Sequence, residues 1–349
     1  MLARLVRISV LKRKTGNELA VLSILISGAR FLLISDFRRK KSFLSDYTKV
    51  HTIMFYPVQL PYKSNKANIE LPTAEEIRAC RDLIYERHAG KIVHISENVV
   101  VKFGRSVTEQ EGQALIYLEQ HASEVPAPRL YGMYRDSHEI FLVMRHIPGV
   151  RLDLCWPSLS HSEKGEISSQ LGAIMANLRG TPCPRPDFFG GLDGGSIHHH
   201  LFYDQRGTGK HIGPFSGETQ FANGLTSNYR ASREYNNIPT FKADFWDSNL
   251  TKVLRGHRPV LTHGDLQKRN IIVAEKEGYA PEAGTRKFEV TLVDWEMAGW
   301  LPDFWEYFCA SLMFSYLGWD DDWCLQVGRF LTVPLAEAAV MREFEKELS

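Results

Sequence analysis

The sequence predicts an α+β fold in which strands come early in the folded region and helices dominate later. Three observations support this prediction. Apolar and β-branched residues predict a hairpin at 91–103 and a further strand at 139–144. Apolar residues at helical spacing between 161 and 180 predict one long helix. Two short apolar runs, 271–273 and 290–293, predict paired buried strands, each next to acidic or amide side chains.

The composition is that of an ordinary globular protein. The chain has 349 residues, 44% of them hydrophobic and 24% charged, which is enough for a large core, two lobes and an extension. Lys and Arg number 42 against 41 Asp and Glu, a formal net charge of +1. Because this balance creates no overall field that attracts nucleic acid, we expect no nucleic-acid partner. The five cysteines are scattered and odd in number, which favours a reducing compartment and a cytoplasmic protein.

Residues 1–60 are predicted to be an N-terminal extension. Five basic residues precede the first acid, Glu18, and the stretch 19–34 is mostly apolar. This pattern leaves a mitochondrial targeting segment, a disordered segment or a non-native start as alternatives. Membrane contact through residues 1–41 is a less favoured alternative, because the apolar stretch is shorter than the roughly 20 residues that a bilayer requires and contains Arg30.

The first organised element is predicted to be a helix over about residues 74–87. Thr73 and Glu76 stand at the spacing of a capping box, and apolar residues then recur at helical period. The hairpin at 91–103 follows, with its turn at Glu97-Asn98.

Lys102 ends the second strand of this hairpin and is predicted to pair with Glu111. An ammonium group on a buried strand needs a counter-charge, since an isolated buried charge is costly. The helix predicted to begin at Thr108 places Glu111 on its inward stripe. The alternative is that Thr108 and Glu111 form only a capping box. We favour the ion pair.

The middle of the chain is predicted to hold a hinge, a core helix and a long irregular segment. The strand 139–144 ends at a breaker, residues 145–149. Ser160 and Glu163 form another capping-box pattern at the start of the long helix. Residues 187–237 are rich in Gly, Asn, Ser and aromatics, as in long loops that are functional or disordered. The histidines 198–200 within them are predicted to be a solvated loop rather than a metal site.

The most informative motif is the run 261–273 together with residues 291–296. Asp265 precedes Asn270 by five positions, so that one loop can aim a carboxylate at a hydroxyl group while the amide reaches a metal ion. Asp294 is expected to emerge near Asn270. Surface turns also favour Asp and Asn, but their order and their flanking strands favour the catalytic interpretation. Only a few residues separate Asp294 from the helix predicted to start near Pro302, and Asp303 is interpreted as an acid at the N-terminus of this helix.

The ordered set Asp265, Asn270 and Asp294 resembles that of the aminoglycoside phosphotransferase family, which are small-molecule kinases. The resemblance implies a bilobal protein-kinase-like fold, with a small β-rich nucleotide-binding lobe at 61–148 and a larger, mainly helical lobe at 149–349 that holds the acceptor pocket. It implies ATP-dependent transfer of the γ-phosphate to a hydroxyl or amine of a small molecule. Asp265 would be the catalytic base, and Asn270 and Asp294 would bind Mg²⁺.

The resemblance also implies how the nucleotide is held. Lys102, supported by Glu111, would bind the α and β phosphates, and the hinge backbone at Met144, His146 and Ile147 would read the adenine edge. The chain departs from protein kinases in having no Gly-rich loop before Lys102. Two alternatives stay open: a catalytically weak or inactive kinase-like binding or scaffold protein, and a protein kinase, which the short segment after Asp294 disfavours. The sequence leaves the acceptor open.

Overall fold

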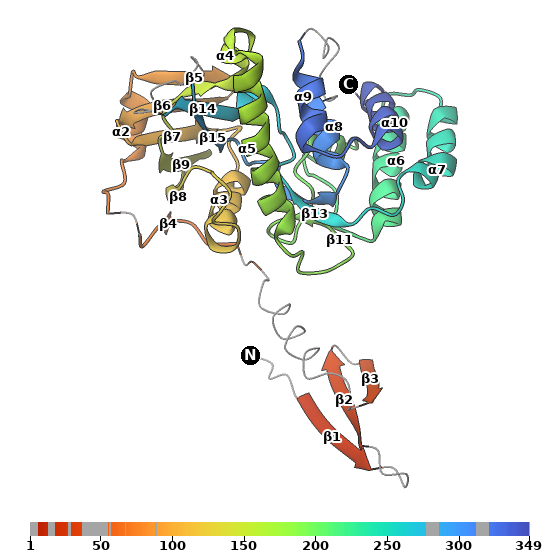
Figure 1. Cartoon of the computed structure of the whole chain (residues 1–349). Coiled ribbons are helices and arrows are strands. Elements are labelled where there is room, and N and C mark those ends of the chain that lie inside the picture. The colour runs from red at the N-terminus through yellow and green to blue at the C-terminus, as the bar shows by residue number, and fades with distance from the viewer. Residues whose placement is uncertain are drawn as a thin grey trace. The chain divides into compact units, whose positions relative to one another are not determined.

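The computed structural model describes residues 55, 57–66, 68–87, 89–276, 286–311 and 321–348, together with the backbone of three strands near the N-terminus. The chain forms two compact units, Met1–Met54 and Phe55–Ser349 (Figure 1). In the first unit, β1 (Val6–Lys12), β2 (Glu18–Ile26) and β3 (Ala29–Asp36) form an antiparallel sheet in that order. The side chains of residues 1–41, where membrane contact was an alternative, lie outside the described part of the chain.

The second unit begins with a β-rich lobe built on a six-stranded antiparallel sheet of order β4-β8-β9-β7-β6-β5. Its strands are β4 (Tyr62–Lys63), β5 (Leu83–Arg87), β6 (Gly90–Ser96), β7 (Val99–Gly104), β8 (Leu130–Asp136) and β9 (Glu139–Arg145). Its helices are α2 (Ala74–Ala79) and α3 (Glu109–His121). The predicted hairpin is confirmed as β6 and β7, and Thr73 and Glu76 form the predicted capping box of α2.

The helix predicted over residues 74–87 is wrong beyond Ala79. Cys80 already has an extended backbone, and Leu83–Arg87 form the edge strand β5. This segment pairs with β6 through Leu83↔Val93 and Arg87↔Gly90. Pairing satisfies the backbone groups that β6 would otherwise expose at the edge of the sheet, which outweighs the local helical pattern.

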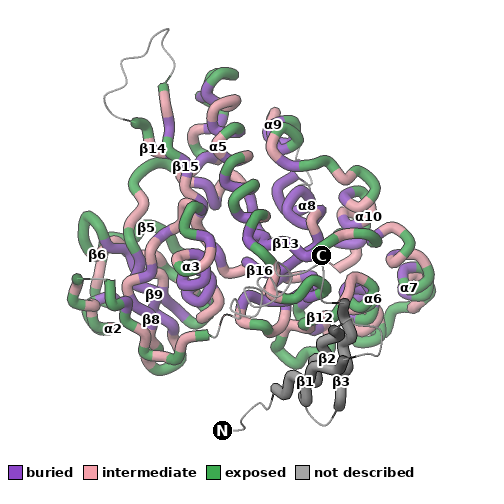
Figure 2. Tube along the Cα trace, turned by 60° about the horizontal axis from the view of Figure 1, so that its bottom comes forward, coloured by how far each residue is buried: buried purple, intermediate pink, exposed green. Residues whose placement is uncertain are grey.

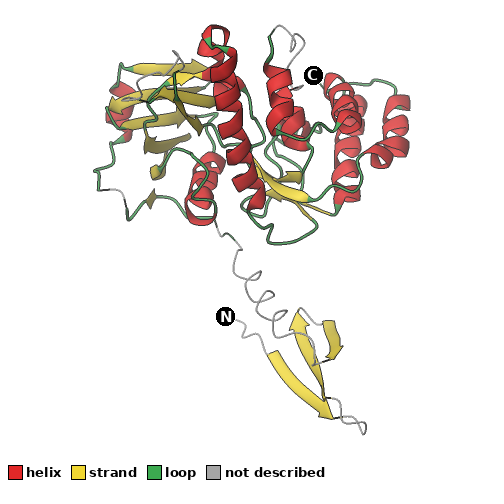
Figure 3. Cartoon of the chain, viewed as in Figure 1, coloured by secondary structure: helices red, strands yellow, loops and turns green. Residues whose placement is uncertain are grey.

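The second, larger lobe is mainly helical, as Figure 3 shows. Its helices are α4 (Leu152–Cys155), α5 (His161–Gly180), α6 (Glu218–Tyr235), α7 (Phe241–Val253), α8 (Trp305–Ser311), α9 (Trp323–Phe330) and α10 (Leu335–Lys346), with short 3₁₀ turns η1 (Trp156–Ser158), η2 (His200–Phe202) and η3 (Lys268–Asn270). The long helix α5 begins at the capping box predicted for Ser160 and Glu163. Among the described residues, no helix combines the length and apolar character needed to cross a bilayer.

Two small sheets complete this lobe. One has the order β10-β14-β15 and the other β12-β11-β16-β13. Their strands are β10 (Val150–Arg151), β11 (Phe188–Gly191), β12 (Phe215–Ser216), β13 (Pro259–Thr262), β14 (Ile271–Glu275), β15 (Phe288–Leu292) and β16 (Gly299–Pro302). These β-rich and mainly helical lobes make the fold bilobal and protein-kinase-like, as predicted.

Two expectations for residues 187–237 are wrong. Residues 218–235 are the helix α6, in which Phe221, Leu225 and Tyr229 recur at four-residue spacing and are fully buried. The Gly, Asn and Ser residues between them hid this stripe in the sequence. His199 is also fully buried rather than solvated, with its ring 5.1 Å from that of Trp305, and burial lowers its pKa well below the usual value.

The hydrophobic core runs through both lobes. Figure 2 shows buried stretches in β8 and β9 as well as in α5 and β13. One cluster joins Leu115 and Met144 of the β-rich lobe to Leu171, Leu261 and Trp295 of the helical lobe. The backbone N–H of Leu292 donates to the carbonyl of Pro126 at 3.1 Å across the same boundary.

Candidate active site

The loop between β13 and β14, residues 263–270, is held by the side chains at its start. His263 is fully buried, and its backbone N–H donates to Oε2 of Glu306 at 2.7 Å. Its ring Nε2 lies 3.0 Å from the carbonyl of Val293, and its Nδ1 accepts from the N–H of Asp265 at 3.3 Å. Both contacts fit a neutral imidazole protonated at Nε2. Gly264 has φ +83°, and a Cβ there would lie 2.3 Å from the carbonyl oxygen of Met297. Only glycine fits this turn.

Asp265 is nearly buried and is surrounded by donors. Asn270 Nδ2 donates to the Asp265 backbone carbonyl and to Oδ2, both at 2.8 Å. Gln267 Nε2 donates to Oδ1 at 2.6 Å, and Arg269 lies 3.3 Å from Oδ2. Burial raises the pKa of Asp265, while the positive charge of Arg269 opposes that rise. The carboxylate is therefore fixed in position.

Asp294 lies beside Asn270, as the sequence predicts. The strands β14 and β15 pair with Ile271 opposite Leu292, and the N–H of Val293 donates to the carbonyl of Asn270 at 2.9 Å. Asp294 itself has φ +67°. A non-glycine residue in this left-handed region is uncommon and tends to mark functional sites.

Lys102 reaches across from β7 to three carboxylates. Its Nζ lies 2.7 Å from Glu111, 2.7 Å from Asp294 and 3.5 Å from Glu296. The predicted Lys102–Glu111 ion pair is present, and Thr108 makes no side-chain cap, so the capping-box alternative is wrong. Burial opposes the charge of Lys102, but the three carboxylates together raise its pKa well above the usual value. For Asp294, burial raises the pKa, and Lys102 outweighs burial and lowers it.

The three acids around Lys102, called the carboxylate cluster below, have a geometry that suits a metal ion. One oxygen from each of Glu111, Asp294 and Glu296 lies within 4.8 Å of the others, and theirs is the one such group among the described residues. Hard oxygen ligands of this kind suit Mg²⁺. The side-chain nitrogen of Asn270 is hydrogen-bonded to Asp265, so the side-chain oxygen Oδ1 of Asn270 is the atom available to bind a metal.

Several residues of this site were not identified as site residues from the sequence. Glu296 follows Asp294 by two positions, which was the available signal. Glu306 anchors the 263–270 loop, and Asp303 lies 2.9 Å from His257 Nδ1. His263 belongs to the motif, but only the structure shows that it connects Asp265 to Val293.

The hinge segment follows β9. Met144 is buried in the sheet between Val100 and Leu130. The backbone N–H of His146 donates to the carbonyl of Asn98 at 3.0 Å. That amide is therefore already paired within the protein.

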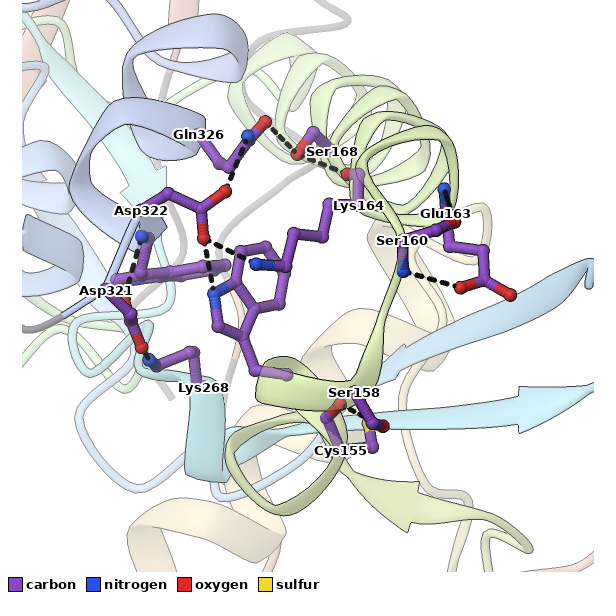
Figure 4. Close-up of polar contacts among 12 residues, drawn as sticks. Cys155, Ser158, Ser160, Glu163, Lys164, Ser168, Lys268, Asp321, Asp322 and Gln326 are labelled. Carbon is purple, nitrogen blue, oxygen red and sulfur yellow. Dashed lines mark hydrogen bonds and ion pairs between the residues drawn. The ribbon is translucent and has the colours of Figure 1, made fainter. Parts of the chain in front are cut away.

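Lys268 belongs to a separate polar network, shown in Figure 4. It pairs with Asp321, while the neighbouring Asp322 accepts from Lys164 Nζ at 2.7 Å and from Trp156 Nε1 at 3.0 Å. This network ties the 263–270 loop to α5 and to the start of α9.

An open cavity of about 360 Å³ lies elsewhere in the helical lobe, between α6 and residues 206–215. It is lined by Arg206, Ile212, Phe215, Gln220, Asn223, Gly224, Ser227, Asn228 and Ala231. Neither Asp265 nor any member of the carboxylate cluster lines this cavity.

The class of protein, a phosphotransferase, follows from a comparison with known protein families. The chain matches the model of the phosphotransferase enzyme family APH over residues 91–344, which is most of its length, and it belongs to this family. A search of curated proteins found no match.

Solved structures similar to this chain include aminoglycoside phosphotransferases. The ternary complex of streptomycin, ATP and APH(2")-IIa is 13% identical, with 86% of each chain covered and a TM-score of 0.47. The gentamicin complex of APH(2")-IIa is 15% identical, with 80% of this chain and 97% of that chain covered and a TM-score of 0.49. The aminoglycoside phosphotransferase APH(4)-Ia is 13% identical, with 78% and 84% covered and a TM-score of 0.49.

Proposed function

We propose that the protein transfers the γ-phosphoryl group of ATP to a hydroxyl or amine of a small molecule. The observation that carries this proposal is the meeting of Lys102, Asp294 and the 263–270 loop, which come from distant parts of the sequence. A cation from one lobe thus faces the acids of the other. Phosphoryl transfer depends mainly on such positioning and charge, because the protein forms few bonds itself.

Each group has a role in this proposal. Lys102, held by Glu111, binds the α and β phosphates. Asp294 and Asn270 would hold Mg²⁺, with Glu296 as a further oxygen ligand, and the bound ion would supply positive charge against the phosphates. Asp265 orients the acceptor hydroxyl and takes its proton. Hydrogen bonds from Gln267 and Asn270 keep this carboxylate aligned for in-line attack.

The two lobes have different roles in this proposal. Residues 61–148 bind the nucleotide, with the His146 carbonyl and the Ile147 amide at the adenine edge next to Met144. Residues 149–349 bind the metal and the acceptor. A small acceptor is supported by the segment after Asp294, which enters β16 and pairs with β13 and β11. That segment leaves little chain for docking a peptide.

Paired substitutions at the two aspartates test this proposal. Asp265→Asn should reduce phosphoryl transfer by roughly 10²–10⁴-fold, the usual contribution of a general base, while Mg-ATP affinity stays near wild type. Asp294→Asn should weaken Mg-ATP binding itself. Asp244→Asn, an acid 60% exposed on α7, is the matched control and should change neither.

Transfer would be measured as ADP formation over a panel of amino sugars, choline-like alcohols and other hydroxylated metabolites, and Mg-ATP binding by calorimetry. Wild-type protein that binds Mg-ATP but phosphorylates no acceptor would support the binding or scaffold alternative. Equal loss of binding and transfer in Asp265→Asn would contradict the role of this residue.

A further inference from the structure

Arg269 lies next to the proposed base and has no role in the function proposed above. It belongs to η3, four residues after Asp265. Its guanidinium lies 3.3 Å from Asp265 Oδ2. The Asp265 side chain is only 7% exposed, whereas that of Arg269 is 37% exposed. A group that approaches this carboxylate from solvent therefore has Arg269 as a neighbour.

The other cations near the site are committed elsewhere. Lys102 is held by the three acids of the carboxylate cluster and is already assigned to the α and β phosphates. Lys268, adjacent in sequence to Arg269, pairs with Asp321 and lies over the Trp156 ring at 5.8 Å from its centroid. Arg269 is therefore the cation that the 263–270 loop places at Asp265.

The 263–270 loop also brings Arg269 near Asp294. Asn270, the residue after Arg269, accepts from the backbone N–H of Val293 at 2.9 Å, and Val293 directly precedes Asp294. Burial raises the pKa of Asp294, Lys102 lowers it most strongly, and Arg269 adds a smaller lowering effect, in agreement with this proximity. In the proposed reaction the γ-phosphoryl group passes from ATP to a hydroxyl oriented by Asp265, in the space beside these two carboxylates.

We propose that Arg269 binds the transferred phosphoryl group, donating from its guanidinium to a γ-phosphoryl oxygen between Asp265 and Asp294. This inference rests on the proposed function. In the reaction the bond from the γ-phosphorus to the β,γ-bridging oxygen breaks, and a bond to the acceptor oxygen forms. The acceptor proton goes to Asp265, and ADP leaves. Arg269 is not consumed, and it stabilises negative charge on the equatorial oxygens as they move.

Guanidinium chemistry fits this role better than amine chemistry does. A planar fork with five N–H donors can keep one contact to Asp265 while another donor meets a phosphoryl oxygen. An anionic group on the acceptor would present the same kind of oxygen to the guanidinium. Binding measurements with nucleotide alone, without any acceptor, distinguish the phosphoryl group from such an acceptor group.

The test compares Arg269→Gln and Arg269→Lys with Arg258→Gln. Arg258 is an exposed arginine at the opposite end of β13 from the 263–270 loop, which makes it a matched control. Affinities for Mg-ADP and for the Mg²⁺ complex of the non-hydrolysable β,γ-imido analogue of ATP would be measured by calorimetry. Thermal unfolding would be recorded for each variant.

Arg269→Gln should bind the imido analogue roughly tenfold or more weakly, the loss expected for a charge-assisted hydrogen bond, and should bind Mg-ADP within about twofold of wild type. Arg269→Lys keeps the charge but not the fork and should fall between Gln and wild type. Arg258→Gln should match wild type. Transfer rates at saturating nucleotide should fall in the same order.

An unchanged ratio of imido-analogue to ADP affinity in Arg269→Gln would overturn the inference. This holds even if transfer to an anionic acceptor were lost, because the guanidinium would then belong to acceptor binding. If Arg269→Gln is too unstable to measure, an Arg269→Lys variant with an unchanged ratio and an unchanged transfer rate overturns it equally. Wild-type protein that binds neither nucleotide contradicts the proposed function instead, so the two failures are distinguishable.

Discussion

Glu306→Ala removes the side chain that anchors the 263–270 loop. Glu306 is 1% exposed, and its Oε2 accepts the backbone N–H of His263 at 2.7 Å. Without it, a buried N–H loses its acceptor, which costs about 1–3 kcal/mol. The space left by the truncated side chain adds to this cost. We expect the free energy of unfolding to fall by about 3 kcal/mol in total.

Glu306→Gln is the matched variant. The amide keeps an oxygen for the His263 N–H, and burial already raises the pKa of Glu306, so loss of the negative charge costs little. We expect Glu306→Gln to lose less than about 1 kcal/mol, as a volume-conserving change does. The difference between Ala and Gln therefore isolates the hydrogen bond and the space that the side chain fills.

Activity should follow the same order, because Asp265 lies two residues after His263. A displacement of about 1 Å at a reacting group costs roughly 10²-fold in rate. Glu306→Ala should thus lose about that factor in kcat, with the KM for Mg-ATP nearly unchanged. Urea unfolding and steady-state kinetics would measure both quantities. Wild-type stability and wild-type kcat in Glu306→Ala would refute the anchoring role.

Three further changes test other parts of the structure. Lys102→Met leaves the carboxylate cluster without its cation and should lower the free energy of unfolding by about 3–5 kcal/mol; urea unfolding with and without Mg²⁺ checks this, and partial rescue by Mg²⁺ is expected because the cluster is a candidate ion site. Glu163 has its pKa lowered to about 2, chiefly by Arg286. The contribution of the Glu163–Arg286 ion pair to the free energy of unfolding is present above about pH 4.5 and is lost as pH falls towards 2. Because the Arg286 side chain is 41% exposed, we expect this ion pair to contribute only about 1–2 kcal/mol of stability. Glu163→Gln should lack this acid-dependent loss of stability in unfolding curves, and a pH profile identical to that of wild type would contradict the prediction. Gly264→Ala places a Cβ against Met297 and should lower kcat while changing the KM for Mg-ATP less. Unchanged steady-state kinetics would show that the turn tolerates a side chain.

The parts of the site that depend on local pattern could be predicted from the sequence. Lys102 and Glu111 come from a strand and the helix that follows it, so their spacing and inward stripes already place them together. Asp294 and Asn270 lie at the ends of two strands that form one hairpin. In both cases the two residues lie on consecutive elements of the chain, so the periodicity of those elements is enough to place the side chains together.

The parts that depend on distant contacts could not be predicted. Nothing near Glu306 in the sequence indicates that it accepts from His263, 43 residues earlier. The strand β5 forms because β6 offers a free edge, although its residues continue an apparent helical pattern. For Arg269, the sequence gives the four-residue spacing from Asp265 but not the unequal exposure of the two side chains.

The core that continues from α3 and β9 into α5 and β13 also determines how the protein unfolds. Tyr117 and Trp300 pack edge to face with 6.3 Å between ring centroids, so each lobe covers apolar surface of the other. Fragments cut at the hinge would expose that surface and would associate or aggregate rather than remain as free domains. We therefore expect residues 55–349 to unfold in a single cooperative transition, which a calorimeter should record as one endotherm rather than two.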